Sequence, residues 1–254
     1  MEIDGRSAVV VGGASGMAKA TAELLATKGA KVAILDLSSS SGIEVAKAIG
    51  ANASFFPCDI TDYEGTERAL QEAVSHLGGL HIAVNTAGGG MAKRTLGKSG
   101  PHPLDEFRRV VELNLVASFN LDRLEAWHMS KNGLEDEERG VIINTSSIAA
   151  FEGQIGQVAY AAAKAGIIGM TFTMARDLGS FAVRVNAIAP SLFLTGITSG
   201  IPDDYAAKLT SDAAFPNRKG RPDEYARLAV AIVENGMLNG GTIRLDAGQR
   251  FAPK

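Results

Sequence analysis

A tyrosine and a lysine interrupt the alanine-rich stretch QVAYAAAKAGII at residues 157–168. Tyr160 and Lys164 are four residues apart, and on a helix this spacing places both side chains on one face, one turn apart. A free phenol has a pKa of about 10, too high for a base at neutral pH, and a nearby ammonium group favours the phenolate. The pair could therefore exchange a proton with a substrate, although a core tyrosine beside a surface lysine would have the same spacing.

A glycine-rich turn, VVVGGASGMAKA at residues 9–20, leads from a hydrophobic run directly into a helical pattern. Gly12 permits the tight turn, Gly16 lets a pyrophosphate approach the backbone, and Ala18 allows the helix to lie close to the strand. The N-terminus of such a helix offers free N–H groups and a partial positive charge to phosphates. The turn therefore predicts a dinucleotide-binding site, with a purely structural turn as the alternative.

Asp36 ends the next hydrophobic run, where a carboxylate can accept hydrogen bonds from both ribose hydroxyls of an adenosine. A 2′-phosphate there would face a like charge. The neighbouring residues supply no compensating cation; they are Ala14, Ser15, Leu37 and Ser38. This position predicts NAD rather than NADP, unless Asp36 is only a helix cap.

Seven short hydrophobic runs alternate with longer helical patterns. They are apolar almost throughout, as expected for parallel strands covered on both faces. Strands are predicted at 7–12, 31–36, 53–59, 80–85, 140–147, 183–190 and 242–246, and helices include 18–29, 63–78 and 157–179. Ser38 to Ser41 can cap a helix after the second strand, and Gly29 and Gly78 occupy positions typical of helix C-termini. This alternation predicts one α/β domain over residues 1–254, a doubly wound sheet of seven mainly parallel strands.

Two long connections follow the fourth and sixth predicted strands, at residues 86–103 and 190–221. In an open parallel sheet, ligands bind outside the carboxyl ends of the strands. Loops of this length in a compact domain are usually functional. We therefore expect both segments to form the walls of a substrate site.

Composition narrows the function classes. The net charge of −3 provides no basic field for nucleic acid or an anionic membrane. The longest apolar runs, such as AVAIV at 229–233, fall short of the roughly 20 residues that span a bilayer. Cys58 is the only cysteine and the four histidines show no ligand spacing, so we expect a cytoplasmic protein without a metal site.

The chain resembles the short-chain dehydrogenases/reductases from end to end. The likeness is carried by VGGASGMA (11–18), PCDITD (57–62), NTAG (85–88), ELNLVASFN (112–120), INTSS (143–147), the Tyr160–Lys164 pair, NAIAP (186–190) with Thr195, and LDAG (245–248). Each motif alone is weak, but all of them occur in the family's order. The resemblance implies a Rossmann-type fold and hydride transfer with a small-molecule substrate.

The same resemblance implies a catalytic set of Asn114, Ser147, Tyr160 and Lys164. In it, Tyr160 is the general acid/base, Lys164 also holds the nicotinamide ribose, and Asn114 holds a water of a proton relay. Ser147 lies 13 residues before Tyr160, the family's spacing, and would polarise the substrate oxygen, so Ser147 and Tyr160 bind the substrate. Adjacent strand residues point to opposite faces, so Ser146 is predicted to be structural.

The resemblance also implies which residues contact the cofactor. They are Gly12, Ser15, Gly16, Met17, Asp36, Asp59, Ile60, Asn85, Thr86, Ala87, Gly88, Tyr160, Lys164, Pro190, Phe193 and Thr195. The sequence departs from the family pattern at Val11, Ala18, Thr86 and Ser191. Val11 and Thr86 are expected to lose side-chain bonds that support the site, which would affect cofactor affinity more than reaction type.

Longer stretches resemble one subgroup, the type 2 3-hydroxyacyl-CoA dehydrogenases. These stretches are residues 140–171, 175–178, 214–226 and 239–248. This likeness implies an NAD-dependent exchange between (S)-3-hydroxyacyl-CoA and 3-oxoacyl-CoA, and a homotetramer paired through the helices that carry Asn114 and Tyr160. A steroid, another ketone or an acyl-carrier-protein thioester is the alternative substrate, and a non-catalytic dinucleotide-binding regulator is the alternative class.

Overall fold

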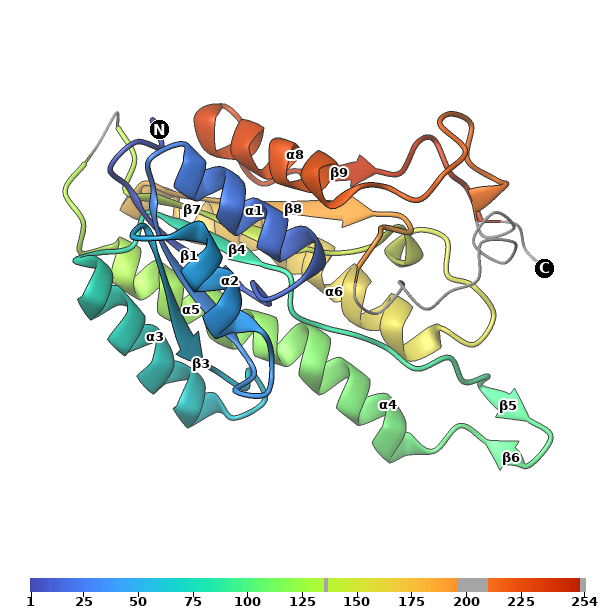
Figure 1. Ribbon diagram of the computed structural model, residues 1–254. Helices are drawn as coiled ribbons and strands as arrows, with labels where there is room; N and C mark the ends of the chain where they lie inside the picture. The colour runs from blue at the N-terminus through green and yellow to red at the C-terminus, as the bar shows by residue number, and fades with distance from the viewer. Residues whose placement is uncertain (135–136, 196–209, 252–254) are drawn as a thin grey trace.

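The computed structural model describes residues 1–134, 137–195 and 210–251, and centres on one seven-stranded parallel sheet (Figure 1). Its strands are β1 (Ser7–Val11), β2 (Lys31–Asp36), β3 (Ala53–Pro57), β4 (Ile82–Asn85), β7 (Gly140–Thr145), β8 (Val183–Pro190) and β9 (Thr242–Leu245). They lie in the order β3-β2-β1-β4-β7-β8-β9. The strands β2 and β3 lie on one side of β1, whereas β4 and all later strands lie on its other side. A ligand crevice is expected at the carboxyl ends of β1 and β4, where the order of the strands reverses.

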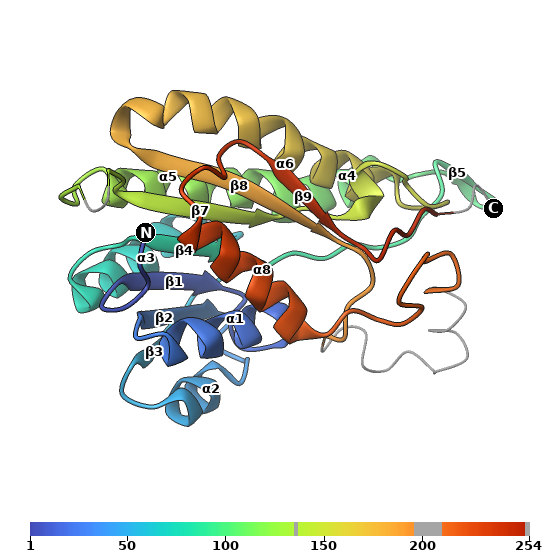
Figure 2. The same cartoon turned by 90° about the horizontal axis from the view of Figure 1, so that it is seen from above.

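Helices cover both faces of this sheet (Figure 2). One face carries α1 (Gly16–Thr27), α2 (Gly42–Ile49) and α8 (Pro222–Glu234), and the other carries α3 (Tyr63–Leu77), α4 (Leu104–Val111), α5 (Ala117–Met129) and α6 (Val158–Asp177). A π-helix at Glu112–Val116 joins α4 to α5, and short 3₁₀ helices occur at Ile148–Ala150 and Gly179–Phe181. These observations confirm the predicted doubly wound α/β fold.

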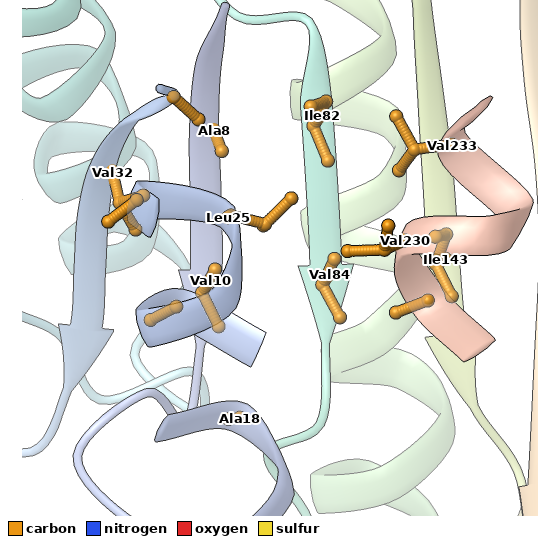
Figure 3. Close-up of a cluster of buried hydrophobic side chains, with 14 of the residues drawn as sticks. Ala8, Val10, Ala18, Leu25, Val32, Ile82, Val84, Ile143, Val230 and Val233 are labelled. Carbon is orange, nitrogen blue, oxygen red and sulfur yellow. The ribbon is translucent and has the colours of Figure 1, made fainter. Parts of the chain in front are cut away.

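The sheet separates two hydrophobic cores. Successive side chains of a strand point to opposite faces. In β1, Ala8 and Val10 pack with α1 and α8, as Figure 3 shows, whereas Val9 and Val11 pack on the side of α3 and α5. Because both faces are buried, the strands must be apolar at nearly every position, and this is why the sequence pattern identified them.

The predicted elements agree with the structure to within a few residues. Gly78 ends α3 in the left-handed conformation with a φ of 79°. Ser41 is the N-cap residue of α2 and its side chain makes no capping hydrogen bond, but Oγ of the neighbouring Ser40 accepts from the Gly42 N–H at 3.3 Å, so a serine of the predicted group does bond to the start of the helix. Of the predicted long connection at 190–221, residues 196–209 lie outside the described residues.

The segment 86–103 contains an element that the sequence did not predict. Residues Leu96–Gly97 (β5) and Gly100–Pro101 (β6) form a two-stranded antiparallel hairpin before α4. Figure 1 shows it standing out from the body of the protein. Two residues per strand are too few for a hydrophobic pattern to show in the sequence.

Helix α6 is long and apolar enough to pass a length-and-hydropathy test for a membrane span. The expectation from the sequence concerned uninterrupted apolar runs, and Lys164 interrupts the run in this helix. Buried core helices of soluble proteins pass the same test, and the inner face of α6, including Ala163, Lys164 and Ile167, is buried within this fold.

Candidate active site

Tyr160 and Lys164 lie on one face of α6, as their spacing predicted. Nζ of Lys164 is 5.7 Å from the centroid of the Tyr160 ring. The lysine is buried, and its Nζ donates a hydrogen bond of 2.8 Å to the carbonyl oxygen of Thr145 at the end of β7. Burial lowers the pKa of Lys164 to about 8. The ammonium group is therefore fixed behind the phenol and does not reach out to solvent.

The two serines after β7 point in different directions. Ser147 is half-buried, its Oγ accepts a hydrogen bond of 3.1 Å from the Ala149 N–H, and its side chain lies close enough to the Tyr160 hydroxyl to lower the pKa of the phenol. Ser146 is buried and donates from Oγ to the carbonyl oxygen of Lys164 at 2.8 Å. The structure thus places Ser147 at the phenol and makes Ser146 a support for α6, as the sequence predicted.

Burial is the largest influence of the protein on the pKa of the Tyr160 phenol. It raises the pKa of Tyr160, and the neighbouring Ser147 side chain partly opposes this effect. From the sequence we expected the ammonium of Lys164 to favour the phenolate, but burial outweighs any such effect. A phenolate at Tyr160 therefore needs more positive charge than Lys164 alone supplies.

Asn114 is buried inside the π-helix, an irregularity that often marks functional sites. Its Nδ2 donates to the carbonyl oxygens of Gly89 (2.6 Å) and Val110 (2.8 Å), and its Oδ1 accepts from the Gly89 N–H (3.1 Å). Asn114 thus clamps the backbone that follows β4. The neighbouring Gly88 has no room for a side chain, because a Cβ there would be 2.6 Å from Oδ1 of Asn114 and 3.3 Å from Nζ of Lys164.

The glycine turn joins β1 to α1 with two left-handed residues, Gly12 (φ 80°) and Gly16 (φ 53°). A Cβ on Gly12 would lie 2.9 Å from Oγ1 of Thr86, and one on Gly16 would lie 3.1 Å from Thr195. Ser15 precedes α1, is exposed, and makes no side-chain capping bond. The first N–H groups of α1, including that of Met17, are therefore available to an anion at this end of the sheet.

Asp36 lies beside this turn at the end of β2. Its Oδ2 accepts from the Ala14 N–H (3.0 Å) and its Oδ1 from the Leu37 N–H (2.7 Å). Asp59, after β3, is exposed, and its Oδ1 accepts from the backbone N–H (2.9 Å) and Oγ1 (2.7 Å) of Thr61. These bonds lower the pKa of Asp59. Both carboxylates are thus fixed where the sheet ends.

Residues 86–89 form the strip of chain that follows β4, and its first residues lie against the glycine turn at Gly12. Thr86 was expected to lose a supporting side-chain bond, and this expectation is wrong, since its Oγ1 donates to the carbonyl oxygen of Val11 at 3.0 Å. The hydroxyl therefore still ties β4 to β1. Asn85 is buried below this strip, and Ile60 is buried in the core beneath β3.

At the end of β8, Pro190 leads into a turn held by the Ser191 N–H, which donates to the carbonyl oxygen of Leu245 at 3.1 Å. Phe193 is buried, with its ring against Gly220, where a Cβ would approach it to 2.5 Å. Thr195 contacts Gly16 as described above. The segment from β8 therefore returns to the glycine turn and forms one wall of the candidate site.

Sequence reasoning missed some residues that build this site. A Cβ on Gly90 would be 2.8 Å from Cδ2 of Tyr160, so Gly90 leaves no room for a side chain beside the phenol, whereas a Cβ on Gly89 would meet nothing within 4 Å. Tyr225 of α8 is fully buried and its hydroxyl lies 2.7 Å from Oγ1 of Thr145. The glycine run was a usable signal, whereas a carbonyl such as that of Thr145 has no sequence signature.

Comparisons with known proteins agree with this geometry. The model of the short chain dehydrogenase family matches residues 6–206. The chain is 46% identical over 254 residues to the 3-hydroxyacyl-CoA dehydrogenase type-2 of Bos taurus, covering 99% of this chain and 97% of that protein. It is 34% identical over 240 residues to the 7alpha-hydroxysteroid dehydrogenase of Escherichia coli K12, covering 91% and 88%.

A solved structure is similar over nearly the whole chain. The crystal structure of 3-hydroxyacyl-CoA dehydrogenase type-2 from Mycobacterium avium is matched with a TM-score of 0.94 and 41% identity, over 98% of both chains. The protein belongs to the short-chain dehydrogenase family. This confirms the resemblance that the motifs indicated.

Proposed function

We propose that the protein is an NAD-dependent dehydrogenase that interconverts (S)-3-hydroxyacyl-CoA and 3-oxoacyl-CoA. The observation that carries this proposal is the grouping of Ser147, Tyr160 and the buried Lys164, in which the Ser147 side chain lowers the pKa of the phenol and Nζ of Lys164 lies 5.7 Å from the centroid of its ring. Full-length relatives named 3-hydroxyacyl-CoA dehydrogenase type-2 support the substrate class. The surviving tyrosine, lysine and serine argue against a non-catalytic regulator.

The residues at the carboxyl ends of β1 and β2 fit an NAD molecule. Gly12 and Gly16 keep the turn compact, and the N-terminus of α1 can donate N–H groups to the pyrophosphate from Ser15, Gly16 and Met17. Asp36 can accept from the adenosine ribose. The adenine and nicotinamide ends would contact Asp59, Ile60, Asn85, Thr86, Ala87, Gly88, Tyr160, Lys164, Pro190, Phe193 and Thr195. When bound, NAD accepts the hydride that leaves the hydroxyl-bearing carbon.

Tyr160 takes the proton of the substrate hydroxyl in the oxidative direction and returns it in the reductive direction. Ser147 donates a hydrogen bond to the same oxygen and stabilises the charge that develops on it. Lys164, fixed by Thr145, stabilises the phenolate, and a cationic nicotinamide adds the positive charge that Lys164 alone does not supply. Asn114 holds the Gly89 backbone beside Lys164 and would hold a water that links Lys164 to solvent in a proton relay.

The proposed assembly is a homotetramer in the cytoplasm, without nucleic-acid or membrane partners. Its support is the outer surface of α5 and α6. Val116, Phe119 and Trp127 are exposed on or beside α5, and α6 exposes a stripe of mostly small residues, namely Val158, Ala162, Ala165, Gly169 and Phe172. Such a stripe permits close helix approach between subunits. Light scattering should show a tetramer, and a stable monomer at micromolar concentration would argue against it.

A substrate panel tests the proposed function. Purified protein is assayed with NAD against 3-hydroxyacyl-CoAs, hydroxysteroids and free secondary alcohols, and with NADH against a 3-oxoacyl-carrier-protein. The proposal predicts the highest kcat/KM for a 3-hydroxyacyl-CoA. A higher value for a steroid or for the carrier-protein thioester would assign the alternative substrate. If the protein turned over none of these compounds but still bound NADH, it would be the non-catalytic dinucleotide-binding regulator.

A further inference from the structure

Two carboxyl groups are completely buried between α5 and the sheet. Asp122 and Glu125 are three residues apart on α5, so both face the sheet, and both have a relative exposure of 0%. They meet Asn85 at the end of β4 and Asn144 in β7, which are also buried. We name these four residues the acid–amide cluster. Asn85 and Asn144 are opposite each other in the register of the two strands.

The amides of the cluster donate to the acids. Nδ2 of Asn85 donates to Oδ1 of Asp122 (3.1 Å) and to Oε2 of Glu125 (2.9 Å), with Oδ1 of Asn144 at 3.4 Å. Nδ2 of Asn144 donates to Oδ2 of Asp122 (2.8 Å). Asp122 therefore has a donor on each oxygen, as an ionised carboxylate requires. Glu125 has a donor on one oxygen only.

No cation neutralises this pair from the elements packed around it. Neither β4 nor β7 carries a charged residue, and the buried face of α3 consists of Thr66 and apolar side chains. Glu112, in the π-helix before α5, is exposed and accepts from the Tyr63 hydroxyl. Burial raises the pKa of both carboxyls of the cluster, and the charge of Asp122 raises that of Glu125 further. Two like charges in this interior are unfavourable, so a proton is expected to remain.

Two oxygen atoms show where that proton belongs. Among the described residues, Oε1 of Glu125 and Oδ1 of Asn85 are both buried without a hydrogen-bond partner. They belong to the two groups that already share the bond from Nδ2 of Asn85 to Oε2 of Glu125. A carboxylic acid and a primary amide are complementary in this arrangement, because the acid O–H can donate to the amide oxygen while the amide N–H donates to the acid carbonyl. One proton on Oε1 would satisfy both orphaned atoms.

We propose that Glu125 is a positioning residue, which keeps its proton on Oε1 and donates it to Oδ1 of Asn85, and that this cyclic acid–amide pair fixes the end of β4 beneath the cofactor. Asn85 directly precedes the strip 86–89, which contacts Gly12, Asn114 and Lys164. Loss of the proton places a carboxylate oxygen against the amide oxygen and loosens the strip. The effect on the cofactor rests on the proposed function, whereas the proton itself does not.

The proton is tested without any cofactor. Carboxyl groups of ¹³C-labelled glutamate are titrated by NMR in wild type, Glu125→Gln and Glu72→Gln, where Glu72 is an exposed residue of α3. We expect one glutamate of the wild type to stay protonated at neutral pH, well above the ordinary value of about 4.3. This signal should be missing in Glu125→Gln and present in Glu72→Gln. Titration of all glutamates in the ordinary range would overturn the proposal.

The positioning role is tested by measuring the affinity for NADH between about pH 6 and about pH 9.5. This range includes the pH values at which Glu125, with its pKa raised by burial, is expected to lose its proton. Gln at position 125 has an N–H in place of the acid O–H and does not titrate. Wild type should lose affinity several-fold relative to Glu125→Gln as the pH rises, while Glu72→Gln follows wild type. Lys164 is intact in all three proteins, so its titration cancels in the comparison.

A parallel pH dependence in wild type and Glu125→Gln would overturn the positioning role. Glu125→Leu, which removes the pair, should bind NADH weakly at every pH, and if this variant does not fold the comparison with Glu125→Gln still decides. A protein that binds no NADH at all would contradict the proposed function. In that case the NMR titration separates the two failures, because it reports the proton alone.

Discussion

The backbone N–H of Ala14 donates a hydrogen bond of 3.0 Å to Oδ2 of Asp36, so the end of β2 supports the glycine turn of β1. The second oxygen of Asp36 accepts from the Leu37 N–H. One carboxylate therefore both shapes the turn and presents an acceptor to the proposed adenosine ribose. Substitution at this position should affect cofactor affinity as well as cofactor choice.

Asp36→Ala should narrow the preference for NAD over NADP and also weaken NAD binding. Hydrogen bonds to a charged group contribute about 1.5–3 kcal/mol, so the KM for NAD should rise about tenfold or more. Asp36→Asn keeps an acceptor for Ala14 and is the matched control, with a smaller loss of NAD affinity. Steady-state kinetics with both cofactors measure this. Equal efficiency of the wild type with NAD and NADP would contradict the role of Asp36.

Ser147→Ala and Ser146→Ala form a matched pair on adjacent residues. Ser147→Ala removes the hydroxyl beside Tyr160, so kcat should fall by several orders of magnitude while NADH affinity stays near wild type. Ser146→Ala removes the bond to the Lys164 carbonyl, which should cost about 1 kcal/mol of stability and little activity. If Ser146→Ala proved the more damaging to kcat, the assignment of the two serines would be wrong.

Lys164 should make the free energy of unfolding depend on alkaline pH. Burial lowers its pKa to about 8 in the folded protein, against 10.5 for a free lysine. Between these values the unfolded chain binds more protons, so the free energy of unfolding rises with pH in this window. Lys164→Met lacks this contribution. Relative to Lys164→Met, the wild type should gain about 1–3 kcal/mol in urea titrations between about pH 7.5 and about pH 10.

The difference in the free energy of unfolding between wild type and Lys164→Met should change over this pH range. A constant difference would contradict the desolvation of Lys164. Arg184→Met would not be a suitable control, because its guanidinium bonds to Glu138 in a separate buried network. Lys19→Met provides a better one, since Lys19 is partly exposed on α1 and pairs only weakly with Glu23 at 3.8 Å.

The hairpin between β4 and α4 offers a test of CoA recognition. Arg94 and Lys98 are exposed there, whereas Nζ of Lys93 is paired with Glu106 at 2.8 Å. If the loop contacts the phosphates of CoA, Arg94→Gln with Lys98→Gln should raise the KM for an acyl-CoA several-fold. Each exposed contact contributes at most about 1 kcal/mol, and the effect should shrink at high salt. Lys93→Gln alone should have a smaller effect.

An uncharged 3-hydroxy ester without CoA is the control substrate for this double variant. Its KM should be almost unchanged, because it has no phosphate to contact. Equal effects on both substrates would show that the loop shapes the site and does not bind CoA.

The sequence predicted the sheet and the glycine turn because both depend on local patterns, whereas the catalytic set and most of the cofactor contacts came from the resemblance to the family. Strands buried on both faces must be apolar throughout, and the glycine turn needs residues that tolerate a positive φ at Gly12 and Gly16. Alternation of side chains along a strand indicated that only one of Ser146 and Ser147 faces Tyr160, and the choice of Ser147 came from the family's spacing of 13 residues. These features could be read without knowledge of distant contacts.

Features that depend on distant contacts could not be predicted. Thr86 was expected to lose a bond, but its hydroxyl reaches Val11 on the neighbouring strand. Charged residues on a helix are usually solvated, so nothing in the pattern of α5 indicated that Asp122 and Glu125 are buried. The same holds for Lys164, whose bond to the Thr145 carbonyl has no residue signature.

The most direct test of the central claim compares wild type with Tyr160→Phe in two measurements on the same preparations. One is the rate of NADH formation from a 3-hydroxyacyl-CoA, and the other is the dissociation constant of NADH. The phenylalanine keeps the ring and removes the exchanging proton, so turnover should fall by several orders of magnitude while NADH still binds. A wild type without NADH formation, or a Tyr160→Phe variant that turns over as fast as wild type, would contradict the proposed mechanism.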